Sequence, residues 1–285
     1  MTRDAAQISS PVGVIAGGGA MPFAVAESLE ARGHAPVVFA LRGACDAQRV
    51  ERFRHHWISL GQYGRARKLF RKEGCRDLLF IGTLARPALS DLRLDWATLR
   101  VMRAVWASFR GGDDHLLSGI GGILQRDGFR MVGIKDVAPG LLMPEGRLTR
   151  NVPDGEANAD IARGRAVLDA LGPFDIGQAA VVIDGHVVGV EGVEGTDALL
   201  ARIAALREQG RIRVPGRRGV MVKAPKRGQD LRFDLPTVGP RTIEGVAAAE
   251  LAGIAVVAGY TLVAEPQTMI DRADAAGLFV VGLPA

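Results

Sequence analysis

The sequence predicts an α/β fold in two domains, an N-terminal Rossmann-like parallel-sheet domain and a C-terminal mixed α/β domain. Three observations lead there. The chain has 285 residues, more than the roughly 100–200 of a common single domain. Apolar segments of strand length alternate with helical segments, a pattern typical of βαβ units. A stretch rich in proline, glycine and polar residues separates the halves. We expect a leader at 1–10, a first domain at 11–138, a linker at 139–157 and a second domain at 158–285.

The first half supplies the alternation that predicts a parallel sheet. Val12–Ala16 is a wholly apolar segment of strand length, and glycines separate it from a helical segment at Met21–Arg32, which Gly33 closes. A second apolar strand is predicted at Pro36–Leu41. Further helices are predicted at 66–72, 96–109 and 115–126, and further extended segments at 78–84 and 130–134.

The second half mixes parallel and antiparallel signals. Ala179–Ile183 and His186–Glu191 flank Asp184-Gly185, a dipeptide typical of two-residue β-hairpins. Some antiparallel pairing is therefore expected. Helices are predicted at 160–171, 197–209, 243–252 and 267–276, and other strands at 220–224, 231–235, 254–259 and 278–282.

Composition narrows the classes of function. With 48% hydrophobic and 24% charged residues, the chain is neither disordered nor fibrous. The net charge of +5 favours an anionic partner, such as a phosphate or an acidic membrane surface. No basic stripe with interleaved aromatic residues appears, so nucleic acid is not expected. No apolar run approaches the roughly 20 residues that span a bilayer, and the two cysteines fit a reduced cytoplasmic protein.

Glycine-rich segments mark two candidate ligand sites in the first half. Gly17, Gly18 and Gly19 lie between a strand and a helix, where backbone N–H groups can bind phosphate. Gly82 and Thr83 follow another strand, at the sheet edge where α/β proteins bind ligands. Pro22 breaks the dinucleotide fingerprint, and Arg42, not an acid, follows the second strand. A ligand-free turn and an NADP-linked oxidoreductase, with Arg42 on the 2′-phosphate, stay open as alternatives.

The segment 191–197 concentrates acidic and hydroxyl groups where a strand gives way to a helix. Glu191, Glu194 and Asp197 accompany Thr196, and two glycines leave room for a ligand. Carboxylates of this kind can hold Mg²⁺ together with water and phosphate oxygens. The alternative is helix capping, with Thr196 as the N-cap.

The segment 223–236 combines cations and carboxylates. Asp230, Arg232 and Asp234 alternate with apolar residues, so they are expected on one face of a strand. A cationic loop that begins at Lys223 precedes them. Phosphoryl chemistry needs this mixture, because cations neutralise phosphate oxygens while a carboxylate binds metal or activates water. A solvated polar row is the alternative.

These motifs resemble the LpxI-type UDP-2,3-diacylglucosamine pyrophosphatases of lipid A biosynthesis. The most specific part is Glu-Gly-Thr-Asp at 194–197 followed by Gln-Asp-Leu-Arg-Phe-Asp-Leu-Pro at 229–236. Ile-Ala-Gly-Gly-Gly at 15–19, Gly-Thr-Leu-Ala-Arg-Pro at 82–87 and Asp-Ile-Gly-Gln-Ala at 175–179 extend the resemblance over nearly the whole chain. Arg227 departs from the proline expected before Gly-Gln-Asp.

The resemblance implies an Mg²⁺-dependent hydrolase of a Gram-negative bacterium, with 158–285 as its catalytic domain. Its substrate is UDP-2,3-diacylglucosamine, held between the two domains, and its products are UMP and 2,3-diacylglucosamine 1-phosphate (lipid X). The enzyme is expected in the cytoplasm, peripherally on the inner membrane, with a homodimer left open. A non-enzymatic module for anionic lipid is a further alternative.

The resemblance and the motifs together assign roles to individual residues. The essential aspartate of the family falls on Asp230, and Lys223 is expected to offset charge on the diphosphate. Glu194, Asp197 and Asp230 are the expected Mg²⁺ ligands. Substrate contacts are expected from Gly17, Gly18, Gly19, Gly82, Thr83, Gln178, Thr196, Gln229 and Arg232.

Overall fold

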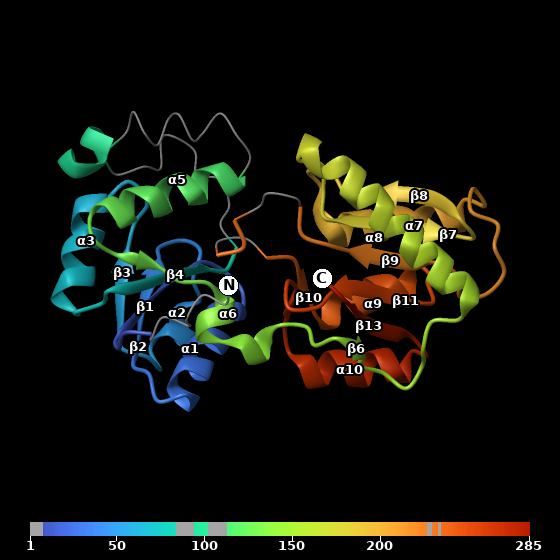
Figure 1. Ribbon diagram of the computed structural model, residues 1–285, viewed down its shortest axis with the longest axis horizontal. Coiled ribbons are helices and arrows are strands. Elements are labelled where there is room, and N and C mark those ends of the chain that lie inside the picture. The colour runs from blue at the N-terminus through green and yellow to red at the C-terminus, as the bar shows by residue number, and fades with distance from the viewer. Residues whose placement is uncertain (1–7, 84–93, 102–112, 227–229, 233–234) are drawn as a thin grey trace. The chain divides into compact units, whose positions relative to one another are not determined.

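The computed structural model in Figure 1 describes residues 8–83, 94–101, 113–226, 230–232 and 235–285. The chain divides into two compact units. The first unit comprises Met1–Gly140 together with the short segment Asp230–Asp234. The second unit comprises Leu141–Gln229 and Leu235–Ala285. Each unit is built around its own sheet.

The first unit contains a parallel sheet of five strands in the order β3-β2-β1-β4-β5. Val14 pairs with Val38 on one side and with Leu79 on the other, so the central strand is buried by both neighbours. This strand order is that of the Rossmann fold, which confirms the predicted Rossmann-like parallel sheet. The strands are β1 (Val12–Ala16), β2 (Pro36–Leu41), β3 (His55–Ile58), β4 (Asp77–Ile81) and β5 (Arg130–Met131).

Helices cover both faces of this sheet. Phe23 of α1 packs with Val50 of α2 on one face, whereas Phe70 of α3 and Leu124 of α5 pack on the other. A separate short helix at 96–101 packs beside the first residues of α3. The rest of the helix predicted at 96–109 falls outside the described residues. The named helices are α1 (Met21–Ala31), α2 (Ala47–Val50), α3 (Tyr63–Lys72), α5 (Asp113–Arg126) and α6 (Ile134–Val137).

The second unit contains a mixed six-stranded sheet in the order β6-β13-β11-β9-β7-β8. Strands β9, β11 and β13 are parallel, whereas β6, β7 and β8 run antiparallel to their neighbours. Its strands are β6 (Gly146–Arg147), β7 (Ala179–Ile183), β8 (His186–Val190), β9 (Val220–Lys223), β11 (Gly253–Val257) and β13 (Phe279–Leu283); β10 (Thr237–Val238) pairs separately with β12 (Leu262–Val263). The mixed α/β prediction is confirmed, and β6 arises within the segment predicted as a linker.

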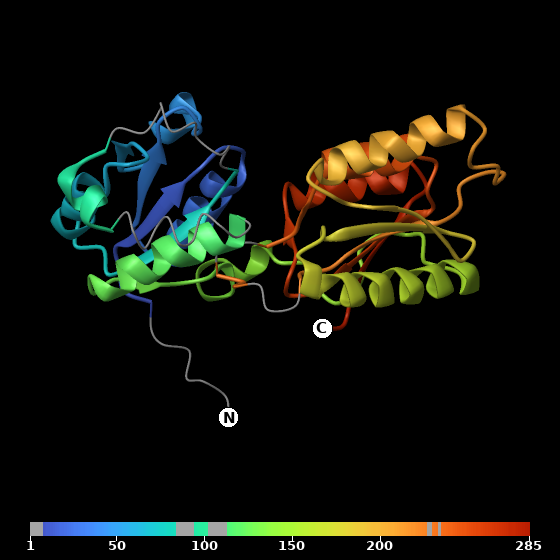
Figure 2. The same ribbon diagram turned by 90° about the horizontal axis from the view of Figure 1, so that it is seen from above.

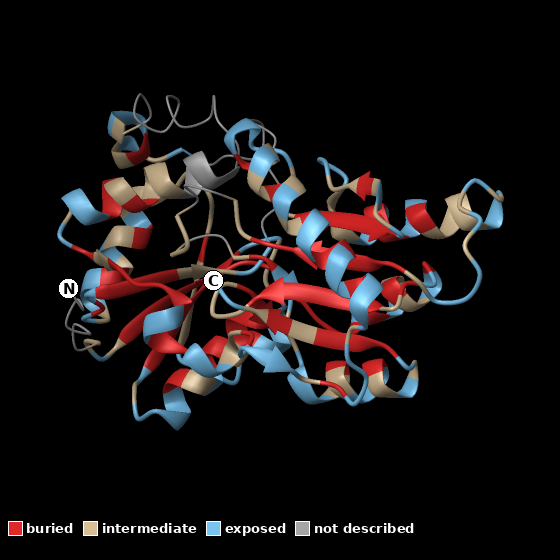
Figure 3. Cartoon of the chain, turned by 45° about the vertical axis from the view of Figure 1, so that its right-hand side comes forward, coloured by how far each residue is buried: buried red, intermediate tan, exposed pale blue. Residues whose placement is uncertain are grey.

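Helix α7 (Gly155–Leu171) covers one face of the second sheet, and α8 (Gly195–Glu208), α9 (Pro240–Ala248) and α10 (Pro266–Ala275) cover the other (Figure 2). The packing residues are aliphatic, as in Ile161 of α7 and Ile203 of α8. Figure 3 shows both sheets as buried layers and the outer helix faces as exposed. Short 3₁₀ turns at Pro139–Leu141 and Gly172–Phe174 complete the fold.

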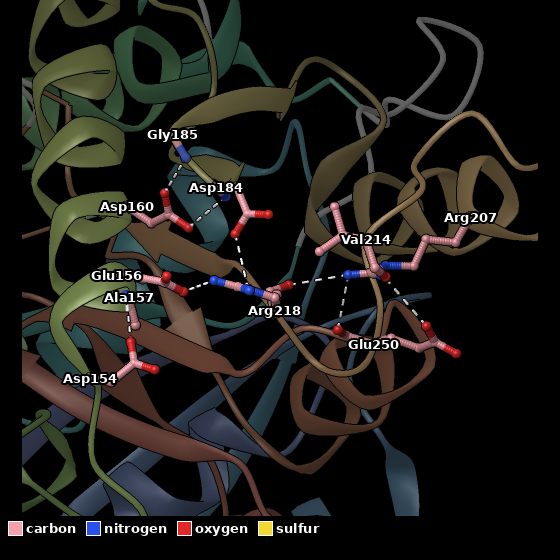
Figure 4. A network of polar contacts seen from close by, with 10 residues as sticks. All are labelled: Asp154, Glu156, Ala157, Asp160, Asp184, Gly185, Arg207, Val214, Arg218 and Glu250. Carbon is pink, nitrogen blue, oxygen red and sulfur yellow. Dashed lines mark hydrogen bonds and ion pairs between the residues drawn. The ribbon is translucent and has the colours of Figure 1, made fainter.

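An arginine network closes the end of the second sheet that carries the β7–β8 turn (Figure 4). Arg218 pairs with Glu156 and, at 3.1 Å from its Nε, with Asp184. Arg207 donates to the main-chain oxygens of Arg218 and Glu250 at 3.2 and 3.1 Å. These contacts join α7, the hairpin turn and the entry to β9. The predicted site residues Lys223 and Gln178 lie at the opposite end of these strands.

One strand prediction is wrong, and one strand was not predicted. Leu231 and Arg232 form a turn and not the strand predicted at 231–235, because the Asp230 carboxylate accepts the Arg232 backbone N–H two residues on. Strand β3 carries His55 and His56, and polar residues at those positions hid it from the apolar pattern. Among the described residues no helix is long and apolar enough to cross a membrane.

Candidate functional site

The glycine-rich predictions of the first unit meet at the carboxyl edge of its sheet. Gly18 follows β1 and Thr83 follows β4, and the two residues form an isolated antiparallel bridge. The Gly18 N–H donates to the Thr83 oxygen at 2.7 Å, and the Thr83 N–H donates back at 3.0 Å. The Gly17 N–H donates to the Ile81 oxygen at 2.9 Å. Two predicted substrate-binding segments are therefore neighbours.

Close backbone packing accounts for Gly17 and Gly82. A Cβ on Gly17 would lie 2.5 Å from the Thr83 oxygen, and a Cβ on Gly82, whose φ is +104°, would lie 2.7 Å from the Gly18 oxygen. Because the N–H groups of Gly17 and Gly18 are used inside the fold, the exposed Gly19 at the start of α1 is the glycine of the triplet placed to meet a ligand. Its surroundings are open, since a Cβ on Gly19 would meet no described atom within 4 Å.

Asp230 and Arg232 belong to the same unit and the same sheet edge. The Cα of Arg232 lies within van der Waals reach of Gly133, which follows β5, the strand next to β4. Asp230 accepts two bonds from the Arg232 guanidinium, at 2.9 and 2.6 Å. These charge-assisted bonds hold the pKa of the Asp230 carboxyl below its usual range, against the opposing effect of burial. Asp230 is therefore a carboxylate at neutral pH.

The second unit brings Lys223, Thr196 and Gln178 together at the carboxyl edge of β9. Lys223 is 6% exposed, and its Nζ donates to the Thr196 hydroxyl at 2.8 Å and to the Thr237 oxygen at 3.1 Å. The Thr196 hydroxyl donates to Glu191 Oε1 at 2.8 Å. The other Glu191 oxygen accepts the Gln178 N–H at 2.9 Å. A continuous hydrogen-bonded row thus joins four elements.

This row decides between two interpretations of Thr196. The structure places Glu194 at the N-cap of α8, so the prediction of Thr196 as the N-cap is wrong. Its hydroxyl links a buried ammonium to a carboxylate instead. Buried charges require partners of this kind, and an ammonium held in such a row has a defined position, as charge stabilisation of an anionic ligand requires.

A surface groove of about 570 Å³ lies beside this row. Ile176 and Val190 give it an apolar wall, and Glu191, Glu194 and Arg202 give it a charged rim. Glu191 is the residue that the row and this groove share, and the groove's volume is in the size range of small-molecule sites.

The predicted Mg²⁺ ligands are not assembled within either unit. Glu194 accepts from Arg202 at 3.0 Å, Asp197 accepts from Arg241 at 2.7 Å, and Asp230 is paired with Arg232. Over the described ranges, no three His, Cys, Asp or Glu side chains gather where they could hold a metal ion. The described carboxylates of each unit do not by themselves fit a metal centre, and the metal assignment stays a prediction.

Two other predictions are limited by what the structure describes. Gln229 and Asp234 lie outside the described residues. Asp230 belongs to the first unit, whereas Lys223 belongs to the second. Arg42, on which the oxidoreductase alternative depends, lies over the Trp57 ring, with 5.7 Å between its Cζ and the ring centroid.

Glu191 is the residue whose importance the sequence understated. It was grouped with the acids of its segment, yet it joins Gln178 to Thr196 and lines the groove. Its position at the end of the strand predicted at 186–191 was the available signal. The Thr237 oxygen had no signal at all, because a backbone acceptor carries no side-chain signature.

Comparison with known proteins extends over both units. Residues 11–141 match the LpxI N-terminal domain, and residues 144–281 match the LpxI C-terminal domain. The chain is 41% identical over 272 residues to the UDP-2,3-diacylglucosamine pyrophosphatase LpxI of Caulobacter vibrioides. That alignment covers 95% of this chain and 97% of the relative.

Proposed function

Because the chain belongs to the LpxI family, we propose that it hydrolyses the pyrophosphate bond of UDP-2,3-diacylglucosamine in lipid A biosynthesis. The products are UMP and 2,3-diacylglucosamine 1-phosphate. The observation that carries this proposal is the 41% identity to a pyrophosphatase of that name across 97% of its length. The convergence of Gln178, Thr196 and Lys223 at one sheet edge supports it from the geometry.

Hydrolysis of a pyrophosphate requires water to attack one phosphorus while the other phosphate leaves. Negative charge grows on the phosphate oxygens during this step, and fixed donors that meet the charge lower the barrier. We assign this role to the Lys223 ammonium, which its contacts with Thr196 and Thr237 hold in place. The amides at the start of α8 supply further positive potential.

We assign to Asp230 the orientation of the attacking water. A carboxylate accepts a hydrogen bond from water and aligns it for attack. The lowered pKa of Asp230 keeps this group anionic at neutral pH, and Arg232 fixes its orientation through two bonds. The exposed amide of Gly19 is proposed to bind a polar group of the substrate at the same edge.

A requirement for Mg²⁺ is proposed on the resemblance of the motifs, and no step above depends on it. EDTA is expected to abolish hydrolysis and added Mg²⁺ to restore it. Unchanged hydrolysis in EDTA would contradict the requirement for Mg²⁺ but would leave the proposed reaction in place. Because the substrate carries two acyl chains, we also propose that the enzyme acts peripherally at the cytoplasmic face of the inner membrane.

The decisive experiment incubates the purified protein with UDP-2,3-diacylglucosamine in detergent micelles and Mg²⁺, and measures UMP release. Asp230→Asn and Lys223→Met are each expected to lower kcat by about 10²-fold or more, the usual effect of removing a charge-stabilising group. Lys223→Arg is expected to remain impaired, because a planar guanidinium cannot replace a buried ammonium at the Thr196 hydroxyl.

The matched controls are Asp271→Asn on α10 and Arg163→Met on α7, which remove an exposed carboxylate and an exposed cation away from the proposed site residues. Both controls are expected to keep the wild-type rate. No UMP release by the wild type would overturn the proposed reaction. Full activity in the Asp230 or Lys223 variant would overturn only the assignment of that residue.

A further inference from the structure

Leu94, Trp96 and Leu99 form an exposed apolar cluster in the first unit, called here the Trp96 patch. Trp96 is 82% exposed, and the two leucines are 43% and 42% exposed. Trp96 and Leu99 lie three residues apart on the helix at 96–101, so they share a face. Neighbouring exposed apolar side chains of this size mark contact surfaces for membranes or other molecules.

Polar contacts on the other side of the segment hold the Trp96 patch in place. The Asp95 N–H donates to the Gly61 oxygen at 3.0 Å, and the Tyr63 N–H donates to the Thr98 hydroxyl at 3.0 Å. Asp95 accepts the Thr98 N–H at 2.8 Å. These bonds hold residues 95–98 against the start of α3.

A row of cations adjoins the patch. Arg65, Lys68 and Lys72 are exposed, and their spacing of three and four residues places them on one face of α3. They are called here the α3 stripe. The Arg65 backbone N–H donates to an Asp95 carboxylate oxygen at 3.2 Å, so the start of the stripe lies beside the residue that separates Leu94 from Trp96.

The α3 stripe carries uncompensated positive charge. Helix α3 contains no acidic residue. Throughout the described residues, no carboxylate forms an ion pair with Arg65, Lys68 or Lys72, while Asp127 pairs with Arg67 on the other flank. The stripe therefore favours contact with a negatively charged surface.

We propose that the Trp96 patch and the α3 stripe together form a docking surface for an anionic lipid bilayer. Tryptophan and leucine insert at the level of the lipid headgroups, and adjacent lysines and arginines bind anionic headgroups. A bilayer accounts for both the apolar patch and the cationic stripe. A polyanion such as RNA would contact the stripe but would give no reason for the exposed leucines. The inference rests on the proposed function for its setting, because a diacylated substrate resides in a bilayer.

The test is co-sedimentation of the full chain with phosphatidylcholine vesicles that contain or lack phosphatidylglycerol, without substrate. Binding is expected to require phosphatidylglycerol and to weaken as salt is added. The fluorescence of Trp96 is expected to shift to shorter wavelength on binding, and the shift is expected to disappear in Trp96→Ala.

Two sets of variants separate the patch from the stripe. Replacing Arg65, Lys68 and Lys72 by glutamine is expected to weaken binding about 100-fold, at about fivefold for each charge removed. Trp96→Ala with Leu99→Ser is expected to weaken binding more than about tenfold, since the inserted apolar area is lost. Phe174→Ala and the triple change of Arg126, Arg163 and Arg211 to glutamine are the matched controls, because they remove exposed groups elsewhere.

Vesicle binding that is unchanged in both sets, or equally lost in the controls, would overturn the proposal. Unchanged vesicle binding with reduced kcat/KM on substrate in micelles would assign the patch to the acyl chains instead. A Trp96-dependent dimer in sedimentation velocity would assign it to a second copy of the chain. Failure of the proposed reaction is recognised separately, as absent UMP release by a wild type that still binds vesicles.

Discussion

Asp230 and Arg232 form an ion pair among the predicted site residues. Two guanidinium bonds and one backbone bond converge on one carboxylate. In the proposed reaction, Arg232 acts through Asp230, as a positioning residue. The same contacts convert an alternating sequence, typical of a strand, into a turn that presents both side chains together.

Replacing Arg232 by glutamine is expected to raise the pKa of Asp230, because the charge-assisted bond that lowers it is lost. In the wild type, kcat/KM should fall only at pH values below the ordinary aspartate pKa of about 3.9. In Arg232→Gln the acid limb should move to higher pH, and Arg232→Lys should lie between. The measurement is the pH profile of kcat/KM for UMP release. If the acid limb of that profile does not move in Arg232→Gln, ionisation of Asp230 does not determine it.

Lys223 illustrates what residue types and their order in the sequence can provide. A lysine at the end of an apolar strand, next to further cations, predicted a group for phosphate chemistry. Its burial and its bond to Thr196 arise from the pairing of β9 with β7, which places Lys223 opposite Ala179 and next to Gln178. Those neighbours lie 44 and 45 positions away in the chain, beyond any local pattern.

At the scale of elements, the bridge between the turns after β1 and β4 holds the ligand edge of the first sheet together. Gly82, directly before the bridging Thr83, has a φ of +104° and no room for a side chain. The backbones at Gly17 and Gly82 pack so closely that neither position has room for a side chain. This packing explains both glycines without a ligand.

Gly82→Ala is expected to destabilise the first unit by about 2 kcal/mol or more, since strain at positive φ adds to a clash with the Gly18 oxygen. Gly74→Ala is the control: its φ of +74° imposes strain, but a methyl group there meets no described atom within 4 Å. The free energy of unfolding measured in urea should be lowest for Gly82→Ala, intermediate for Gly74→Ala and highest for the wild type. Equal losses would show that the close packing is relieved by a small shift.

At the scale of the whole molecule, lowered carboxyl pKa values are concentrated in the first unit. A hydrogen bond from His56 lowers the pKa of Glu73, and one from Tyr63 lowers that of Asp127. The pKa of Asp230, also assigned to this unit, is lowered by Arg232. Each such group adds stability above its unfolded pKa, and that stability is lost as the pH falls through its folded pKa.

The first unit is therefore expected to lose stability in acid before the second unit does. All three tryptophans lie between residues 57 and 106, so their fluorescence reports on the first unit, whereas far-UV circular dichroism reports on both. Below about pH 4.5, where carboxyl groups of ordinary pKa begin to protonate, the urea midpoint seen by fluorescence should fall faster than that seen by circular dichroism. Asp127→Asn should reduce the difference, and parallel midpoints would contradict the expectation.

Local patterns in the sequence predicted most of the helices and strands and the kind of chemistry to expect. Apolar segments of strand length, glycines at helix ends and the Asp184-Gly185 turn predicted both sheets, because such patterns depend on neighbours a few residues apart. The acids, the lysine and the glycine triplet predicted phosphate chemistry for the same reason. Strand β3 and the turn at Asp230 escaped this reasoning, since polar residues on a covered strand and a local carboxylate bond both break the expected period.

Only the tertiary structure decided which predicted residues meet. Strand order brings Gly18 to Thr83, and the register of β7 with β9 brings Gln178 and Thr196 to Lys223 through Glu191. It also decided that the amides of Gly17 and Gly18 are used inside the fold, and that Trp96 stands exposed beside a basic helix. The physical reason is that hydrogen bonding and burial depend on distance in space, which a linear pattern does not contain.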